Sequence, residues 1–411
     1  MNFFNRQLFP SFELHVFIRI FFAGEDLLHA FRRSPSPWTQ NWSLPGSFLY
    51  IHIAIAAADA PQGRESTMKP LLLAATLICL ASAGYRLYPE PPASNWTMTK
   101  DSESLVPDPK LRSQIFRALD AAEHAGTNPT ISHFQVRAAT VVEIGGQEHV
   151  VLGGNTEYEI PEAIHGESAL LNHVTSLYGA DATKHAVRFV AFFTKTCGGS
   201  GSCGDCRDFQ IASTDYEHLL IACGQASDHT VRVHRFMEQL VCEANFPEVE
   251  SAKIPLTPDQ LAGLVKMAWE ARRGGVTLFT TDRHTGAAGL SYSGKTYRIA
   301  AADDAAFHYR YPIGGLLQEA FTDRDYFLRA IIIAGEPGKW PVVNYRDRQY
   351  GFEASSFNHQ AGKQPIVLIL TDGKGKYRMT TFEDALPYPF SIARFKPEAI
   401  TDFLKSHPAE K

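Results

Sequence analysis

The spacing of four residues constrains the fold of this chain more than any other feature. His165 and Glu167 stand at the start of one predicted helix, and Cys203 and Cys206 stand at the start of another. The 38 residues from His165 to Cys203 (203 − 165) accommodate one helix and one strand, so the two helix starts can meet at one end of a sheet. One imidazole and two thiolates can hold a tetrahedral zinc ion with its fourth position open. The spacing therefore predicts an α/β fold around a Zn²⁺ site.

Simpler roles for the same residues remain open at this stage. Cys203 and Cys206 could form a redox pair, and His165 could be a core histidine. Glu167 could be a solvated carboxylate in the first helical turn, where the helix dipole favours it. The occurrence of all four residues in this order favours the metal site.

Composition limits the partners of the chain. Its 411 residues are enough for two or three domains, and its net charge of −5 provides no basic surface for nucleic acid. A small diffusible substrate is therefore expected, with no nucleic acid partner. Six cysteines are too few for a disulfide scaffold. Four of them fall in the stretch from Cys197 to Cys223, around the zinc-like spacing, so we expect reduced thiols. Cys197 and Cys223 themselves are predicted to be free thiols.

The first hundred residues differ from the rest. Residues 1–67 show no sustained period and are predicted to be a disordered or artefactual extension. Residues 68–100 contain an apolar, signal-like segment followed by a Pro-rich linker. The apolar segment is a secretory signal if translation starts at Met68; otherwise it is a membrane anchor or a fortuitous apolar run. We expect a cytoplasmic protein unless residues 68–84 direct export or anchoring.

Hydrophobic periodicity then predicts an alternation of helices and strands. The Cys-x-x-Cys helix is expected to have Ser202 as its N-cap, and the last helix of this part is expected to have Thr257 as its cap. The predicted helices span 111–125, 164–178 and 255–273, and the predicted strands span 134–143, 149–153, 187–194 and 218–221.

The same order returns in the second half, with a period of about 145 residues. Asn344 and Asp347 stand where the cysteines stood, and no His-x-Glu precedes them. One metal-binding copy and one metal-free copy are therefore predicted. The predicted strands of the second copy span 276–281, 291–300, 328–334 and 365–371, and its helices lie around 316–321 and 346–357.

Five segments of the chain carry distinctive motifs: SHFQVRAA (132–139), GGNTEYE (153–159), HGESALL (165–171), CGDCRDF (203–209) and LPYPF (386–390). In this order they resemble the cytidine deaminase family in its form with a catalytic first half and a degenerate second half. The similarity runs from about residue 104 to residue 395. Three departures stand near the motifs: Ser202 replaces a proline, Arg137 replaces a glycine, and the loop before His165 carries Glu159 and Glu162.

The resemblance implies two tandem three-layer α/β/α domains, a catalytic one over 101–255 and a degenerate one over 256–411. Each is expected to hold a mixed sheet of about five strands. The implied activity is zinc-dependent hydrolytic deamination of cytidine or deoxycytidine in pyrimidine salvage, by a homodimer. Glu167 would carry a proton from the activated water to the pyrimidine N3 and then to the leaving amino group. The degenerate domain would bury the site and supply the interface.

The resemblance also assigns the substrate contacts. Asn155 and Glu157 would bind the ribose 3′-hydroxyl, Phe134 would stack on the base, and Arg207 would donate to a ligand sulfur. Their alternatives are a turn, a core aromatic residue and a surface helix residue. The departures leave two rival functions open: a deaminase of another aminonucleoside or of RNA, and a silent nucleoside-binding protein.

Overall fold

The computed structural model describes two compact units, Met1–Pro89 and Glu90–Lys411. In the first unit it describes only the backbone of an antiparallel pair, β1 (Gln40–Ser43) and β2 (Tyr50–Ile53). In the second unit it describes residues 94–158, 163–194, 201–278, 284–303, 309–392, 396 and 398–408. The signal-like segment 68–84 lies outside the described residues.

The first half of the larger unit is built on a six-stranded mixed sheet in the order β3-β11-β10-β9-β5-β6. Two of these six strands have no counterpart among the predicted strand ranges: β11, and β3, an edge strand of only two residues. β9 and β10 are parallel, whereas β5 is antiparallel to both of its neighbours. The strands are β3 (Thr97–Met98), β5 (Arg137–Ile144), β6 (Gln147–Gly154), β9 (Phe189–Thr194), β10 (Leu220–Gln225) and β11 (Thr230–Arg235).

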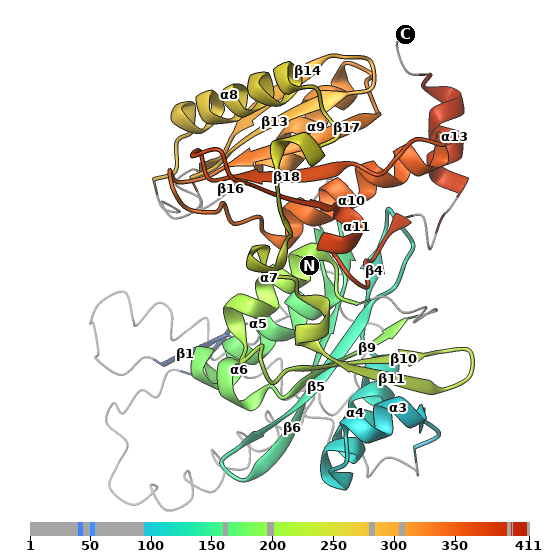
Figure 1. The fold of residues 1–411 in the computed structure, drawn as a ribbon. Helices are drawn as coiled ribbons and strands as arrows, with labels where there is room; N and C mark the ends of the chain where they lie inside the picture. Colours follow the sequence, from blue (N-terminus) through green and yellow to red (C-terminus); the bar gives the residue numbers. More distant parts are fainter. Residues whose placement is uncertain are drawn as a thin grey trace, which may run out of the picture. The chain divides into compact units, whose positions relative to one another are not determined.

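Helices cover both faces of this sheet (Figure 1). The helices α3 (Lys100–Leu105) and α4 (Pro109–Glu123) pack on one face, around a core that includes Ile115 and Leu119. A second core, around Leu170 and Leu171, fills the other face. That face carries α5 (Gly166–Tyr178), α6 (Ala180–Ala186) and α7 (Gly204–Ser213). A core on each face explains why β9 is a continuous apolar run rather than an alternating one.

The second half repeats this plan with a sheet in the order β12-β19-β18-β17-β13-β14. Helix α8 (Pro258–Gly274) covers one face, and α9 (Pro312–Thr322), α10 (Tyr345–Gln360) and α11 (Phe382–Ala385) cover the other. α13 (Glu398–Ser406) packs on α10. The strands are β12 (Glu248–Val249), β13 (Gly286–Ser291), β14 (Thr296–Ala300), β17 (Leu328–Ala334), β18 (Val367–Thr371) and β19 (Tyr377–Thr381).

Short elements complete the described chain. They are the strands β4 (Asn128–Pro129), β7 (Thr156–Glu157), β8 (Ala163–Ile164), β15 (Ala302–Asp303) and β16 (Tyr309–Arg310), and the 3₁₀ helices η1 (Phe236–Gln239), η2 (Glu243–Asn245) and η3 (Ser251–Lys253). The contacts group both halves into one compact unit, so their division into two domains near residue 255 stays a prediction.

The predicted strand over 276–281 is wrong in its described part. Val276 forms only an isolated bridge, to Ala302, and residues 279–281 lie outside the described residues. The strand that pairs with β14 and β17 is β13, which is rich in glycine and alanine. The β-branched residues of 276–281 gave a stronger strand pattern in the sequence than these small residues did. A Cβ at Gly286 would lie 2.4 Å from the carbonyl oxygen of Ala268, so small residues in β13 let α8 approach the sheet closely.

The cap of α8 is as predicted. The Thr257 side chain accepts a hydrogen bond from the Gln260 backbone amide, and Gln260 returns one to Thr257, so the two residues form a capping box. The prediction of a free thiol at Cys223 is wrong, because Cys223 is disulfide-bonded. Cys197 lies outside the described residues.

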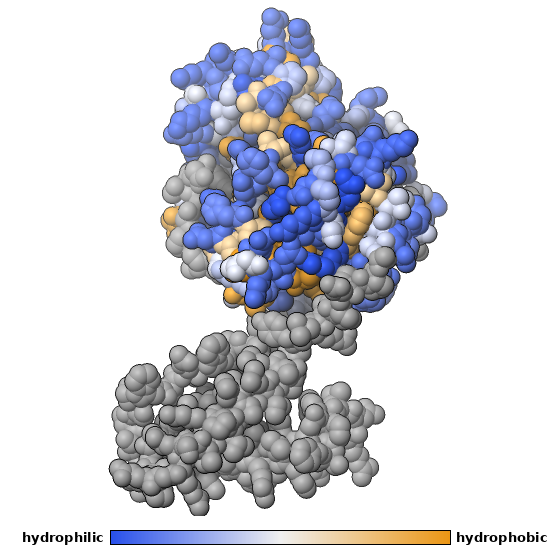
Figure 2. Space-filling view, turned by 90° about the horizontal axis from the view of Figure 1, so that it is seen from below, coloured by the Kyte–Doolittle hydropathy of each residue, from blue (hydrophilic) through white to orange (hydrophobic). Residues whose placement is uncertain are grey.

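The surface of the described part is mostly polar on the face shown in Figure 2, with hydrophobic residues appearing between hydrophilic ones. Within the described residues, no helix combines the length and apolar character needed to cross a bilayer.

Candidate metal centre and substrate cavity

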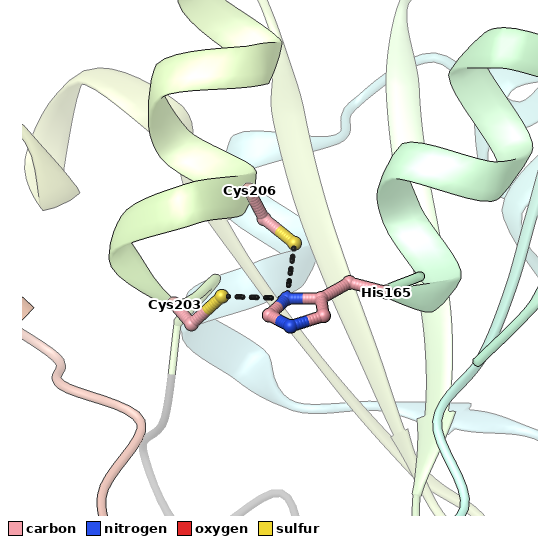
Figure 3. A group of neighbouring side chains, drawn as sticks. All are labelled: His165, Cys203 and Cys206. Carbon is pink, nitrogen blue, oxygen red and sulfur yellow. Dashed lines mark hydrogen bonds between the residues drawn. The ribbon is translucent and has the colours of Figure 1, made fainter. Parts of the chain in front are cut away.

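Three metal-binding side chains converge at the N-terminal ends of two helices (Figure 3). His165 is the N-cap of α5, Cys203 is the N-cap of α7, and Cys206 lies in the first turn of α7. Their donor atoms all lie within 4.8 Å of one another. The His165 Nδ1 atom faces both sulfurs, at 3.0 Å from Cys203 and 3.4 Å from Cys206. The structure thus brings together the three residues that the sequence paired across one helix and one strand.

The chemistry of this donor set fits zinc. Cys203 and Cys206 are both free of disulfides, and one imidazole nitrogen with two sulfurs leaves one tetrahedral position open. A hydrogen bond from Cys206 and the adjacent His165 imidazole hold the pKa of Cys203 well below its ordinary value. The negative charge on Cys203 in turn raises the pKa of His165 to about 10. A thiolate at a helix N-terminus is the form in which cysteine binds metals.

Glu167 lies beside these donors without being one of them. It occupies the first turn of α5, only 7% exposed, and lines the cavity described below. Burial, followed by the negative charge on Cys203, raises the pKa of the Glu167 carboxyl. A carboxyl that holds a proton more readily than usual suits a group that accepts and returns one.

A cavity of about 170 Å³ opens next to the metal centre. The Phe134 and Phe390 rings form a pair of walls, with centroids 5.5 Å apart and planes tilted by 55°. The sequence identified the motif that ends at Phe390 but gave it no role, so Phe390 and the adjacent Ser391 are site residues that sequence reasoning missed. The lining residues are Ser132, Phe134, Val136, Asn155, Glu157, Ala163, His165, Gly166, Glu167, Phe192, Thr194, Gly201, Cys203, Phe390 and Ser391.

Asn155 and Glu157 both line this cavity and also fix its rim. The Asn155 amide accepts from the Val136 backbone N–H at 2.9 Å and donates to the Phe134 carbonyl oxygen at 2.8 Å. The Glu157 carboxylate accepts from the backbone and hydroxyl of Ser132. Burial raises the pKa of Glu157, but these hydrogen bonds outweigh it and lower the pKa below its ordinary value. Glu157 is therefore ionised at neutral pH, and a ribose-binding role for both residues stays a prediction.

The N-terminus of α7 is capped differently from the prediction. Ser202 is not the N-cap, because α7 begins at Gly204 and Cys203 occupies the N-cap position, where its side chain makes no capping bond. The buried Ser202 donates its backbone N–H to the Gln239 side chain at 2.9 Å. The first helical amide, that of Gly204, donates to the side chain of Gln349 from the second half at 3.3 Å.

Arg207 bonds other groups than the ligand sulfur that the resemblance implied, and Arg137 lies away from the cavity. The fully buried Arg207 guanidinium donates to backbone carbonyls of Ser202, Gln239, Pro387 and Tyr388, rather than to a ligand sulfur. It thereby ties the metal-binding helix to the segment that leads to Phe390. Arg137 does not line the cavity. Its guanidinium donates to the Glu123 carbonyl at the end of α4 and to the Gln135 side chain.

The second half has a contact within the protein at the place that corresponds to the candidate metal centre. α10 begins after Asn344 as α7 begins after Cys203, and α9 follows Tyr311 as α5 follows His165. The Asp347 carboxylate accepts the backbone N–H groups of Ile313 and Gly314, at 2.9 and 3.0 Å. Among the described residues, the one group of three or more side chains placed to hold a metal is the one in the first half.

Comparison with known proteins found no matching protein-family profile and no matching curated protein. Solved structures of cytidine deaminases do match. That of Burkholderia pseudomallei aligns at 23% identity over 33% of this chain and 100% of its own, with a TM-score of 0.28. That of Mycobacterium tuberculosis aligns at 21% identity over 32% of this chain and 95% of its own, with a TM-score of 0.23. That of Mycobacterium leprae aligns at 17% identity over 33% of this chain and 100% of its own, also with a TM-score of 0.23. Similarity at this level gives no ground for transferring an activity, so the function has to follow from the site.

Proposed function

We propose that this protein is a zinc-dependent hydrolase that deaminates cytidine or deoxycytidine to uridine or deoxyuridine. The observation that carries the proposal is the convergence of His165, Cys203 and Cys206 beside the buried Glu167, in an aromatic-walled cavity. A redox role for the two cysteines would require neither the imidazole that faces both sulfurs nor the carboxyl next to them.

The three donors would hold the metal through His165 Nδ1 and the two cysteine sulfurs. Zinc in such a site supplies Lewis-acid activation of water near neutral pH. The N-terminus of α7, which carries both Cys203 and Cys206, would stabilise metal-binding thiolates through its backbone N–H groups and dipole.

Glu167 would move the protons of the reaction. It takes a proton from the attacking water and delivers it to the pyrimidine N3, as a C–O bond forms at C4. It then returns the second proton of the water to the exocyclic amino group, and the C4–N bond breaks. The balance is one nucleoside and one water converted to the keto nucleoside and ammonia.

The cavity walls support a nucleoside rather than a larger substrate. Phe134 and Phe390 provide apolar surface for a flat base. Glu157 provides a charged acceptor for a sugar hydroxyl, which a free base would not use. A place in pyrimidine salvage and assembly into homodimers are further parts of this proposal.

The test is ammonia release from cytidine and deoxycytidine by the purified full chain, with zinc measured on the same sample. We expect one zinc per chain, turnover, and loss of turnover on treatment with a chelator. Glu167→Ala should keep the zinc and lose about 10²- to 10⁴-fold in kcat, the usual contribution of acid–base catalysis. Glu143→Gln, an exposed carboxylate on β5, is the matched control and should retain full activity.

Two results would contradict the proposal. A chain without zinc would exclude the mechanism. Zinc without turnover of either nucleoside would retain the metal centre but redirect the substrate search to other aminonucleosides.

A further inference from the structure

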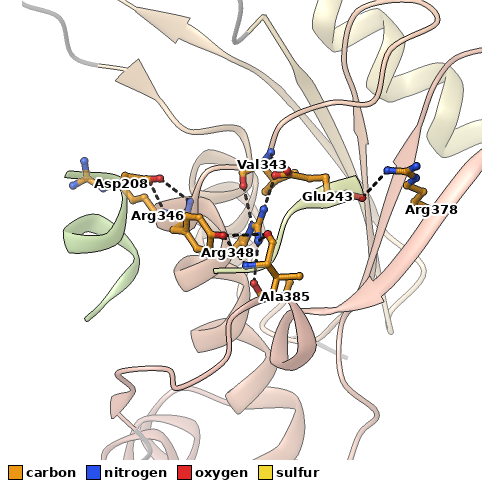
Figure 4. Close-up of polar contacts among 9 residues, drawn as sticks. Asp208, Glu243, Val343, Arg346, Arg348, Arg378 and Ala385 are labelled. Carbon is orange, nitrogen blue, oxygen red and sulfur yellow. Dashed lines mark hydrogen bonds and ion pairs between the residues drawn. The ribbon is translucent and has the colours of Figure 1, made fainter. Parts of the chain in front are cut away.

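The helices α7 and α10 cap each other across the two halves of the molecule. The Asp208 carboxylate, on α7, accepts the backbone N–H groups of Tyr345 and Arg346 at the start of α10 (Figure 4). In return, the Gln349 side chain, on α10, accepts the backbone N–H of Gly204 at the start of α7. The two capping residues are equivalent, because each lies five residues after the N-cap of its own helix (208 − 203 and 349 − 344).

The two caps differ in what they touch. Asp208 caps the helix of the metal-free half, whereas Gln349 caps the helix of the metal-binding half, at the residue that follows Cys203. The Gln349 amide group also donates to the Phe390 carbonyl oxygen at 2.6 Å. One side chain from the second half therefore contacts both the metal-binding helix and a wall of the cavity.

The surroundings of Gln349 hold it in this place. Its amide also donates to the Glu353 carboxylate at 3.0 Å, and Glu353 accepts the Ile392 backbone N–H at 3.3 Å. A Cβ at Gly204 would lie 2.8 Å from the Gln349 Cβ, so the glutamine stem packs directly on the helix start. These contacts fix the Gln349 amide between two parts of the site that come from opposite halves of the chain.

The charge of the cap also differs between the two helices. Asp208 places a carboxylate at the start of α10, where no thiolate lies. An anion at the start of α7 would compete with Cys203 and Cys206 for the positive end of the helix dipole. Asp205, in the first turn of α7, already places one carboxylate there, and Arg346 from α10 pairs with it at 2.6 Å. Gln349 is a neutral acceptor, so it satisfies the Gly204 amide without adding a second anion.

We propose that Gln349 is a positioning residue for the metal centre, which sets Cys203 relative to Phe390 by bonding Gly204 and Phe390 with one side chain. The expected effect on cytidine kinetics rests on the proposed function, whereas the expected effect on metal affinity does not. In this role the second half does more than cover the site, because it supplies the cap of the helix that binds the metal.

Co²⁺ titration of the full apo-chain tests this role without requiring activity, because cobalt–thiolate absorption reports binding. Gln349→Met keeps the length of the side chain and removes its polar contacts with Gly204, Phe390 and Glu353. We expect Co²⁺ binding to weaken about 10- to 100-fold, as is usual when a partner of a metal ligand is lost. In the zinc enzyme we expect the KM for cytidine to rise more than kcat falls, because Phe390 shifts. Gln349→Asn, which keeps the amide but is one methylene too short to reach both partners, provides a milder variant with the same expected directions.

The matched control is Asp208→Leu, which removes the equivalent cap on α10. It should lower the thermal unfolding temperature while keeping the Co²⁺ affinity of the wild type. The proposal is overturned if the Gln349 variants bind Co²⁺ and cytidine as the wild type does, or if Asp208→Leu loses Co²⁺ affinity to the same extent. Weaker Co²⁺ binding by the Gln349 variants in a chain that deaminates no nucleoside would support this inference and refute the proposed function.

Discussion

Glu157 and Asp303 are carboxylates at equivalent places in the two halves. Glu157 ends the short strand β7 and accepts the backbone N–H of Ile131. Asp303 ends the short strand β15 and accepts the backbone N–H of Leu278. Only Glu157 lines the cavity beside the metal centre. This difference allows the role of the carboxylate in binding the sugar to be separated from its role in supporting a loop.

Glu157→Gln is expected to lower kcat/KM for cytidine about 10- to 100-fold, chiefly through KM. The reason is that a hydrogen bond to a charged group is worth about 1.5–3 kcal/mol. Asp303→Asn makes the same change in the half without the cavity and should leave kcat/KM unaltered. Steady-state kinetics of both variants is the measurement, and equal losses in the two would exclude a specific contact between Glu157 and the sugar.

Asp347 is expected to make the stability of the protein depend on pH. Burial raises its pKa to about 7, despite the two backbone N–H groups that it accepts. The Asp347 carboxyl therefore holds its proton more tightly in the folded state than in the unfolded state. The free energy of unfolding should fall as pH rises from about 4 to about 7. The loss is at most about 1.4 kcal/mol for each unit by which the folded and unfolded pKa values differ. Asp347→Asn keeps an acceptor for the same N–H groups but does not titrate.

Denaturant unfolding at pH 5 and pH 7.5, with zinc in excess, measures this effect. The wild type should lose stability between the two pH values relative to Asp347→Asn. Unfolding curves of the two proteins that shift in parallel would show that the Asp347 carboxyl is already ionised at the lower pH.

At the scale of elements, the close contact of α7 with α10 depends on Gly204. A Cβ there would lie 2.1 Å from the Tyr345 carbonyl oxygen, so any larger residue must push the two helix starts apart. Gly204→Ala should destabilise the fold by about 1–3 kcal/mol, as overpacking does, and weaken zinc binding. Gly263→Ala is the control, since the Gly263 site in α8 is open and alanine should stabilise the helix by up to about 1 kcal/mol. Thermal unfolding and zinc competition measure both variants, and a neutral Gly204→Ala would contradict the described packing.

The sequence predicted the elements that carry strong patterns. The apolar run of β9 and the Thr257 cap of α8 lie where periodicity and capping rules put them. It failed at β13, because the small residues that let α8 pack closely carry no strand signal. The spacing of His165 and Cys203 sufficed to predict that their side chains meet, since it follows from one helix and one strand.

Other parts of the site could not be predicted in the same way. Phe390 and Gln349 reach the site from more than 140 residues beyond Cys203 (349 − 203 = 146), through the packing of two helices. No local pattern encodes such a contact. The motif that ends at Phe390 was visible in the sequence, but its position over the cavity depends on bonds from Arg207 and Gln349.

At the scale of the whole molecule, two buried arginines join the halves. Arg207 donates to Pro387 and Tyr388 of the second half, and Arg348 donates to Val241 and pairs with Glu243 of the preceding segment (Figure 4). Each guanidinium bonds a carbonyl five residues before it, so the two form an equivalent pair. Removing the second half would take two of the four acceptors from the Arg207 guanidinium, and a charge that loses its buried partners is destabilising.

Deletion of residues 274–411 is therefore expected to abolish activity or solubility. The truncation removes Phe390 from the cavity, Gln349 from the start of α7 and two of the acceptors of Arg207. It also exposes the surface of α7 that packs on α10. The measurements are the soluble yield, the zinc content and the ammonia release of the truncated chain beside the full chain, with the oligomeric state of each. An active, monomeric truncation would show that the first half is self-sufficient and that the contacts between the halves are dispensable for the reaction.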